Sequence, residues 1–111
     1  MTTTHSLNEL GKEAEALAKE ALDRSLDVPE FWIRRGVALD MQGRWAEAGG
    51  AFVKALELAP VNSTVWYYHA YHLSLNEIAK PMALAAIENS LRLDPVSPSA
   101  IALQRRLSST R

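Results

Sequence analysis

The sequence predicts an all-α fold in which about six helices form antiparallel hairpins that stack side by side. Three observations support this prediction. Apolar residues recur at intervals of three and four along most of the chain, which is the period of an amphipathic helix. Proline or glycine separates these stretches at short intervals. The pattern that begins at Trp32 begins again at Trp66, thirty-four residues later, and no stretch shows the alternation that a strand needs.

Length and composition narrow the range of functions. The chain has 111 residues, enough for one domain with a modest core. Twelve basic and thirteen acidic residues give a net charge of -1, so charge favours neither nucleic acid nor a membrane surface as a partner. Cysteine is absent, which excludes disulfides and thiolate metal ligands. No apolar run approaches the roughly 20 residues that span a bilayer, and residues 1–6 do not resemble a secretory signal. We therefore expect a soluble, cytoplasmic protein.

The first helix is expected at residues 6–26. Ser6 and Glu9 form a capping box at its start. Its apolar stripe consists of Leu7, Leu10, Ala14, Leu17, Ala18, Ala21 and Leu22. Charged residues on the opposite face keep that side in water, which suits a helix at the end of a stack.

The next two helices form the first predicted hairpin. One runs from about residue 28 to residue 42, with Asp27 and Glu30 as a capping box and Pro29 in the first turn. Gly43 interrupts the pattern. The other runs from residue 44 to residue 58 and ends before Pro60, which cannot continue a helix. Its apolar stripe consists of Trp45, Ala48, Phe52, Ala55 and Leu56.

A second hairpin and a final helix follow the same plan. A helix begins at Asn62 or Ser63, a turn occupies residues 76–80, and another helix covers residues 81–93. Pro95 ends it thirty-five residues after Pro60, and we place the extra residue in the turn, which tolerates an insertion better than a packed helix does. The last helix, residues 97–108, is capped by Ser97.

Residues 29–62 resemble a tetratricopeptide repeat. The matching positions are Trp32, Gly36, Leu39, Gly43, Ala48, Phe52, Ala55 and Pro60. Residues 63–96 resemble a second, less regular repeat, and residues 6–26 and 97–108 resemble flanking half repeats, all within one domain of residues 1–111. The resemblance implies a right-handed α-solenoid whose concave groove binds other proteins.

The first repeat departs from the family pattern at three positions. Arg35 stands where the family usually has leucine, and its stem can lie along the hairpin edge. Gly49 and Gly50 lie in the middle of a predicted helix, where each costs about 1 kcal/mol relative to alanine. Either a neighbour packs close to that backbone, or this face of the helix is weakly constrained.

The register of the two repeats predicts which side chains face the groove. These are Glu30, Ile33, Val37, Asp40 and Met41 in the first repeat and Thr64, Tyr67, Tyr68, Tyr71, Ser74 and Leu75 in the second. Three tyrosines without a lysine favour an apolar, hydrogen-bonding surface for a helix or an extended peptide. Ile33 and Val37 replace the cation and the amide with which some family members grip a terminal carboxylate, so we do not expect that mode of binding.

The alternative is that the last helix covers at least one of the tyrosines, because a short solenoid turns tightly. Trp32 and Trp66 are interpreted as packing residues between the helices of each hairpin, unavailable to a ligand. Their value is that they set the register of the groove.

Catalytic and metal chemistry find little support. His69 and His72 are three residues apart, but a helical metal pair is usually four apart and needs a third ligand. The sequence shows no serine, histidine and aspartate arrangement and no phosphate-binding loop. Three arginines near the C-terminus are interpreted as solubilising residues. We expect no enzyme activity, no cofactor and no metal.

The sequence therefore predicts a non-catalytic scaffold that holds a peptide or helix of a partner protein. Two alternatives stay open. The chain can be a structural module of a larger repeat protein or associate weakly with itself, since Leu7, Leu10, Ile101 and Leu103 lie on terminal helices. It can also be a small secretion-type chaperone that masks an aggregation-prone helix. The sequence does not identify the partner.

Overall fold

The computed structural model describes residues 11, 12, 16, 24 and 28–109. The described residues form five α-helices and one short 3-10 helix and no strand, which confirms the all-α class. The helices are α2 (Pro29–Met41), α3 (Trp45–Leu58), α4 (Ser63–Ser74), α5 (Lys80–Leu93) and α6 (Pro98–Ser109), with the 3-10 helix η1 (Glu77–Ala79) between α4 and α5. Of the predicted helix at residues 6–26, residues 11, 12, 16 and 24 are described and are helical, whereas the rest, with its Ser6 capping box, lies outside the described residues.

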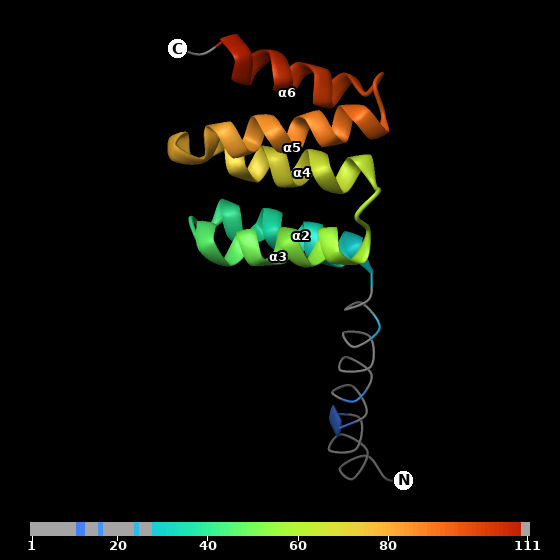
Figure 1. Ribbon diagram of the computed structural model, residues 1–111. Coiled ribbons are helices and arrows are strands. Elements are labelled where there is room, and N and C mark those ends of the chain that lie inside the picture. The colour runs from blue at the N-terminus through green and yellow to red at the C-terminus, as the bar shows by residue number, and fades with distance from the viewer. Residues whose placement is uncertain (1–10, 13–15, 17–23, 25–27, 110–111) are drawn as a thin grey trace, which may run out of the picture.

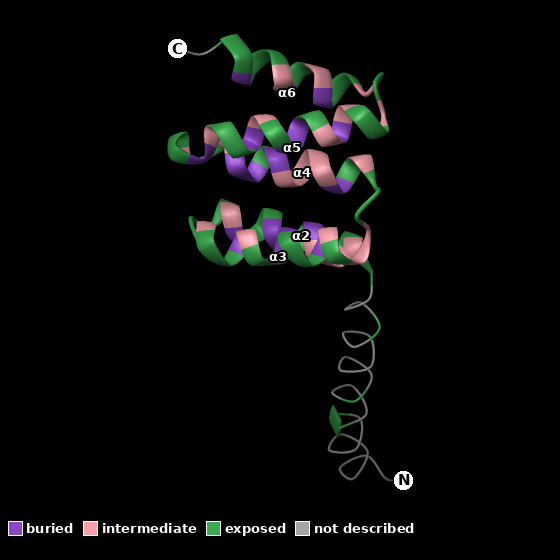
Figure 2. Ribbon diagram, viewed as in Figure 1, coloured by how far each residue is buried: buried purple, intermediate pink, exposed green. Residues whose placement is uncertain are grey.

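The helices form two stacked hairpins and a terminal helix (Figure 1). Helices α2 and α3 make the first hairpin, α4 and α5 make the second, and α6 packs on the far side of the second. Buried residues lie on the faces where neighbouring helices meet, and exposed residues lie on the outer faces (Figure 2). This arrangement brings α4 between the first hairpin and α6.

The helix ends depend on local residues, and most occur where the sequence places them. Gly43 adopts a φ of 77° in the turn between α2 and α3, a conformation that favours glycine. Asn62 caps α4, since its side-chain oxygen accepts hydrogen bonds from the backbone N–H of Thr64 at 2.9 Å and of Val65 at 3.2 Å. Ser97 caps α6 through a 3.3 Å hydrogen bond from the N–H of Ala100.

The start of α2 is described from Val28 onward. Val28 is the N-cap of α2, and its own side chain makes no capping bond. The predicted capping box pairs Glu30 with Asp27, which lies outside the described residues. Pro29 occupies the first turn as predicted, and its fixed φ and missing N–H favour the start of a helix there.

The buried apolar residues form two clusters, one for each hairpin. The first includes Leu39, Phe52 and Ala55, and it also receives Val65 from α4. A β-carbon on Gly36 would lie 2.6 Å from the Phe52 ring, so this glycine lets the ring fill the space between α2 and α3. The second joins α4, α5 and α6; its buried members are Ala70, Leu73, Ala79, Ala83, Ala86, Ile87, Ala100, Leu103 and Leu107.

The indoles of Trp32 and Trp66 are half-buried, so they are less enclosed than the sequence suggests. The Trp66 indole N–H donates a 2.8 Å hydrogen bond to the carbonyl oxygen of Pro60. Trp45 is also half-buried, and it packs against the second cluster although it begins α3 of the first hairpin. Trp45 therefore links the two hairpins, a role that the repeat pattern does not predict.

Candidate functional site

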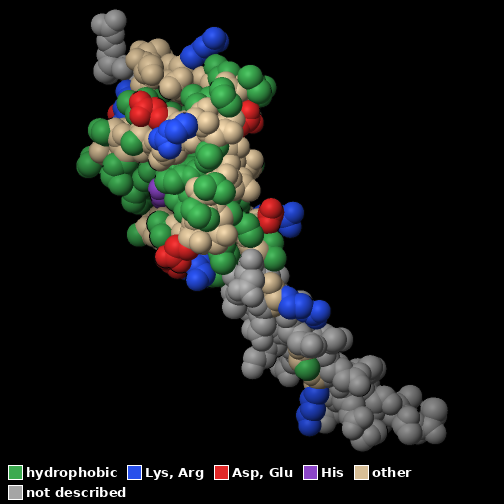
Figure 3. Space-filling model, turned by 45° about the vertical axis from the view of Figure 1, so that its right-hand side comes forward, with side chains coloured by type: hydrophobic (Ala, Val, Ile, Leu, Met, Phe, Trp, Pro, Cys, Tyr) green, Lys and Arg blue, Asp and Glu red, His purple; other side chains and the backbone are tan. Residues whose placement is uncertain are grey.

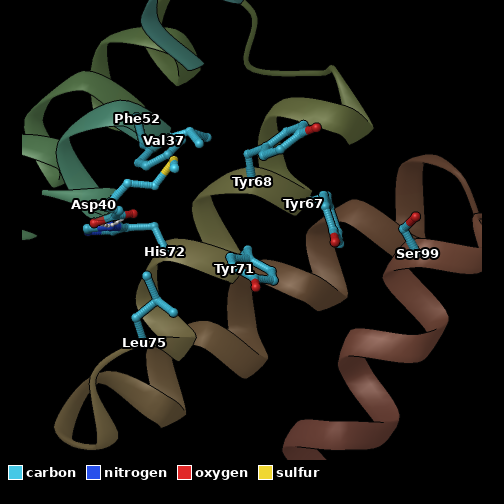
Figure 4. Close-up of a pocket in the computed structure, with 10 residues that line it drawn as sticks. Val37, Asp40, Phe52, Tyr67, Tyr68, Tyr71, His72, Leu75 and Ser99 are labelled. Carbon is cyan, nitrogen blue, oxygen red and sulfur yellow. Dashed lines mark hydrogen bonds and ion pairs between the residues drawn. The ribbon is translucent and has the colours of Figure 1, made fainter. Parts of the chain in front are cut away.

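A cavity with a volume of about 580 Å³ lies beside α4. Its lining comes from α2, α3, α4 and α6, together with Leu75 at the C-terminal end of α4. We call it the tyrosine cavity; it is lined by Val37, Asp40, Met41, Phe52, Tyr67, Tyr68, Tyr71, His72, Leu75 and Ser99. Figure 4 shows Asp40 and His72 against each other at one end and Ser99 at the other, with the tyrosines between them.

Many of the residues predicted to face a groove lie together around this cavity. They are Val37, Asp40, Met41, Tyr67, Tyr68, Tyr71 and Leu75. Thr64 and Ser74 line smaller neighbouring pockets. Glu30 is exposed in the first turn of α2 and lies outside the tyrosine cavity. Ile33 is mainly a core residue, 9% exposed, because it packs in the same cluster as Val65 of the next hairpin.

Three lining residues were not predicted as site residues: Phe52, His72 and Ser99. Phe52 was assigned to the core, and its exposed fraction of 1% confirms that place, although it also forms part of the cavity wall. Ser99 comes from α6, whose position against α4 depends on the stacking of the whole chain. The sequence offered one indirect signal for His72, because a close neighbour was one of the two explanations for Gly49, and in the structure that neighbour is His72.

The three tyrosines form an aromatic row on α4. The rings of Tyr67 and Tyr68 meet edge to face with centroids 5.2 Å apart, and those of Tyr67 and Tyr71 are 6.3 Å apart. Burial raises the pKa of the Tyr67 phenol, and the neighbouring Tyr71 and Tyr68 raise this pKa further. Tyr67 therefore stays protonated at neutral pH and can donate a hydrogen bond to a ligand.

Helix α6 covers part of the tyrosine row. The Arg106 guanidinium lies 5.5 Å from the centroid of the Tyr71 ring, a cation–π geometry, and a smaller pocket between α4 and α6 is lined by both residues. Tyr71 nevertheless remains 40% exposed. Helix α6 therefore covers Tyr71 only in part, whereas the alternative drawn from the sequence was that the last helix covers at least one tyrosine.

The end of the cavity is formed by a buried pair of polar side chains. The Nδ1 atom of His72 lies 2.9 Å and 2.8 Å from the two carboxylate oxygens of Asp40, and the His72 side chain is only 1% exposed. Asp40 and His72 are the only acidic or basic side chains among the described residues that line the tyrosine cavity. Because the Asp40 carboxylate is hydrogen-bonded to His72, the rest of the cavity lining presents mainly apolar and hydroxyl groups to a ligand.

The histidines do not form a metal site in the described part of the chain. His72 turns toward Asp40 of the first hairpin, while His69 packs edge to face against Trp66, with centroids 6.1 Å apart. No group of three potential ligands is found among the described residues. The spacing of three on one helix points the two rings to different neighbours.

Antiparallel hairpins with short turns and small residues at close contacts are the arrangement typical of helical repeats. Residues 29–60, which include α2 and α3, match the tetratricopeptide repeat family. The match confirms the predicted resemblance for this part of the chain, and tetratricopeptide repeats are helical modules that mediate protein interactions. No curated protein matches the chain. That α4 and α5 form a second repeat stays a prediction.

None of the described helices combines the length and the apolar character that crossing a bilayer requires.

Proposed function

We propose that this protein is a non-catalytic scaffold that binds an amphipathic helix or an extended peptide of a partner protein in the tyrosine cavity. The observation that carries the proposal is the cavity itself, about 580 Å³ in volume and lined by three tyrosines and several exposed apolar side chains. Rigid aromatic residues supply a large contact area at a small cost in conformational entropy.

The chemistry of the lining supports an apolar partner face. Met41 is 83% exposed, Leu75 is 52% exposed and Val37 is 36% exposed, so each loses contact with water when a ligand covers it. Burial of apolar surface contributes about 25 cal/mol per Å². The tyrosine hydroxyls add hydrogen-bonding groups at the edge of this surface, as the polar rim of an interface does.

A matched pair of valine variants tests the site. Val37 lies in the tyrosine cavity, whereas Val53 lies on α3 away from that cavity and is 47% exposed. Both residues are replaced by aspartate, and the wild type and the two variants are used to capture proteins from the native lysate, followed by mass spectrometry. We expect Val37→Asp to lose a partner that Val53→Asp retains, because a charge then lies in the apolar contact.

The contact is then mapped on the molecule. A peptide from the captured protein is titrated into 15N-labelled wild-type protein, and the amide resonances of Val37, Tyr67 and Tyr71 should shift. Shifts confined to the outer face of α3, or equal capture by both aspartate variants, would show that the partner binds elsewhere and would refute the proposal.

The structure weakens one argument for self-assembly, namely that the apolar residues of the terminal helices are free to contact another chain. Leu103 is 4% exposed and belongs to the second core cluster, so it is already covered by neighbours in its own chain. Leu7 and Leu10 lie outside the described residues. A small secretion-type chaperone is a special case of the proposed function, and identification of the captured partner distinguishes it.

A further inference from the structure

The buried pair of Asp40 and His72 joins the first hairpin to the second, in addition to the apolar contacts between them. Asp40 lies near the end of α2, and His72 lies near the end of α4, thirty-two residues later. The two carboxylate oxygens lie at 2.8 Å and 2.9 Å from the same ring nitrogen. A carboxylate only accepts hydrogen bonds, so Nδ1 of His72 carries the proton.

The imidazole is held by the first hairpin on its other sides as well. It stacks on the Trp45 indole with centroids 4.6 Å apart and an angle of 20° between the planes. The Trp45 N–H donates a 3.1 Å hydrogen bond to the backbone oxygen of His72. A β-carbon on Gly49 would lie 3.2 Å from Nε2 of His72, so the bare backbone of α3 leaves room for the ring. His72 is therefore seated in a slot built by α2 and α3.

Two kinds of contact attach α4 to the first hairpin, at different points along its length. Near its start, Val65 and Tyr68 pack into the apolar cluster of α2 and α3. Near its end, the attachment runs through His72 and its partners Asp40 and Trp45. An apolar contact permits small rotations, whereas a hydrogen-bonded pair fixes both distance and direction.

From this arrangement we infer that the Asp40–His72 pair is a latch that sets the angle between the two hairpins and thereby the width of the tyrosine cavity. Both residues form the cavity wall, so a change in their separation changes the cavity directly (Figure 4). They act as positioning residues: they hold Tyr68 and Tyr71 of α4 at a fixed distance from Val37 and Met41 of α2. The consequence for binding rests on the proposed function, but the latch itself does not.

The latch is tested by measuring the distance between the hairpins. The chain contains no cysteine, so Ala46→Cys on α3 and Ala85→Cys on α5, both at exposed positions, can carry two nitroxide labels for pulsed EPR. In this background Asp40→Ala removes the acceptor, and the conservative Asp40→Asn keeps one acceptor oxygen. We expect the distance distribution to broaden and shift in Asp40→Ala and to return most of the way toward the wild type in Asp40→Asn.

A matched control separates the latch from a general loss of an ion pair. Glu47→Ala removes the exposed pair of Arg44 and Glu47, whose atoms lie 2.7 Å apart on α3, and should leave the distance distribution unchanged. In parallel, the indole N–H resonance of Trp45 should move in Asp40→Ala and not in Glu47→Ala. Long-range 15N spectra of the wild type should show the proton of His72 on Nδ1.

Several outcomes would overturn the inference. A folded Asp40→Ala protein with an unchanged distance distribution would show that the pair adds stability without setting the angle. If Asp40→Ala does not fold, the nearly isosteric Asp40→Leu, which accepts no hydrogen bond, takes its place, and a wild-type distance distribution in that variant would show the same. A proton on Nε2 with Nδ1 unprotonated would contradict the geometry. None of these outcomes depends on a partner, so failure of the latch is distinct from failure of the proposed function.

Discussion

His69 is a titratable residue that folding partly buries without a charge partner among the described residues. Burial lowers the pKa of its imidazole below the ordinary value of 6.5, and the nearby His72 lowers it further. Its Nδ1 atom is buried and has no hydrogen-bond partner among the described residues. A neutral ring with its proton on Nε2 tolerates this position best, because an unprotonated nitrogen carries no N–H group that must be satisfied.

The pKa shift of His69 predicts how stability changes with pH. Because the folded state holds this proton more weakly than the unfolded state, the unfolded state binds more protons as pH falls below about 6.5. The contribution of His69 to the free energy of unfolding is therefore present above this pH and decreases until the pH lies below the pKa of the folded state. Chemical denaturation of the wild-type and His69→Gln proteins at pH values from about 8 to about 5 measures this contribution, because that interval brackets the ordinary pKa of histidine.

The variant supplies the control for this prediction. His72 and the carboxylates are common to both proteins, so the difference between their pH profiles belongs to His69. We expect the wild type to lose more stability than His69→Gln on acidification. A wild-type profile that is parallel to or flatter than that of the variant would contradict the pKa shift.

At the scale of helices, the two adjacent glycines of α3, Gly49 and Gly50, differ in how closely α4 approaches them. Both lie in α3 and are costly for the helix. A β-carbon on Gly49 would approach His72 of α4 at 3.2 Å, but one on Gly50 would meet no atom within 4 Å. Of the two sequence interpretations, close packing therefore applies to Gly49 and weak constraint applies to Gly50.

This contrast predicts opposite effects for the same substitution. Gly50→Ala should stabilise the protein by about 1 kcal/mol, because alanine favours the helix and contacts nothing. Gly49→Ala gains the same propensity but pushes against a ring held by α2 and α3, and overpacking of this kind costs about 1–3 kcal/mol. We expect a net loss for Gly49→Ala. Urea denaturation of both variants measures the difference, and equal stabilisation by both would show that α3 and α4 can separate at little cost.

The sequence predicts the helices and their ends better than it predicts the contacts between helices. The end of α3 at Leu58, the end of α5 at Leu93 and the Ser97 cap were all predicted, because Pro60, Pro95 and the serine act on their own backbone. The pair of Asp40 and His72 was not predicted. Its partners lie on different hairpins, and only the stacking angle decides that they meet. The aromatic row of the candidate site was predictable because all three tyrosines lie on one helix.

At the scale of the whole molecule, the helices of residues 29–109 form a stack in which each layer packs mainly on its neighbours. The first core cluster belongs to α2 and α3 with Val65 of α4, and the second belongs to α4, α5 and α6. Helix α6 covers the second cluster with Leu103 and Leu107, which are 4% and 7% exposed. A stack of this kind is expected to open from the layer that is weakened, since stability is roughly a sum over layers and their interfaces.

Leu103→Ala tests whether the layers open separately. The substitution leaves a cavity under α6 and should cost about 2–4 kcal/mol, whereas Arg105→Ala, two residues away at an exposed position of the same helix, should cost less than about 0.5 kcal/mol. Hydrogen exchange followed for each amide shows where the loss appears. We expect Leu103→Ala to accelerate exchange in α6 and α5 first and in α2 and α3 least. An equal acceleration in all described helices would mean that the hairpins unfold as one unit, with the contacts of His72 and Trp45 strong enough to couple the two core clusters.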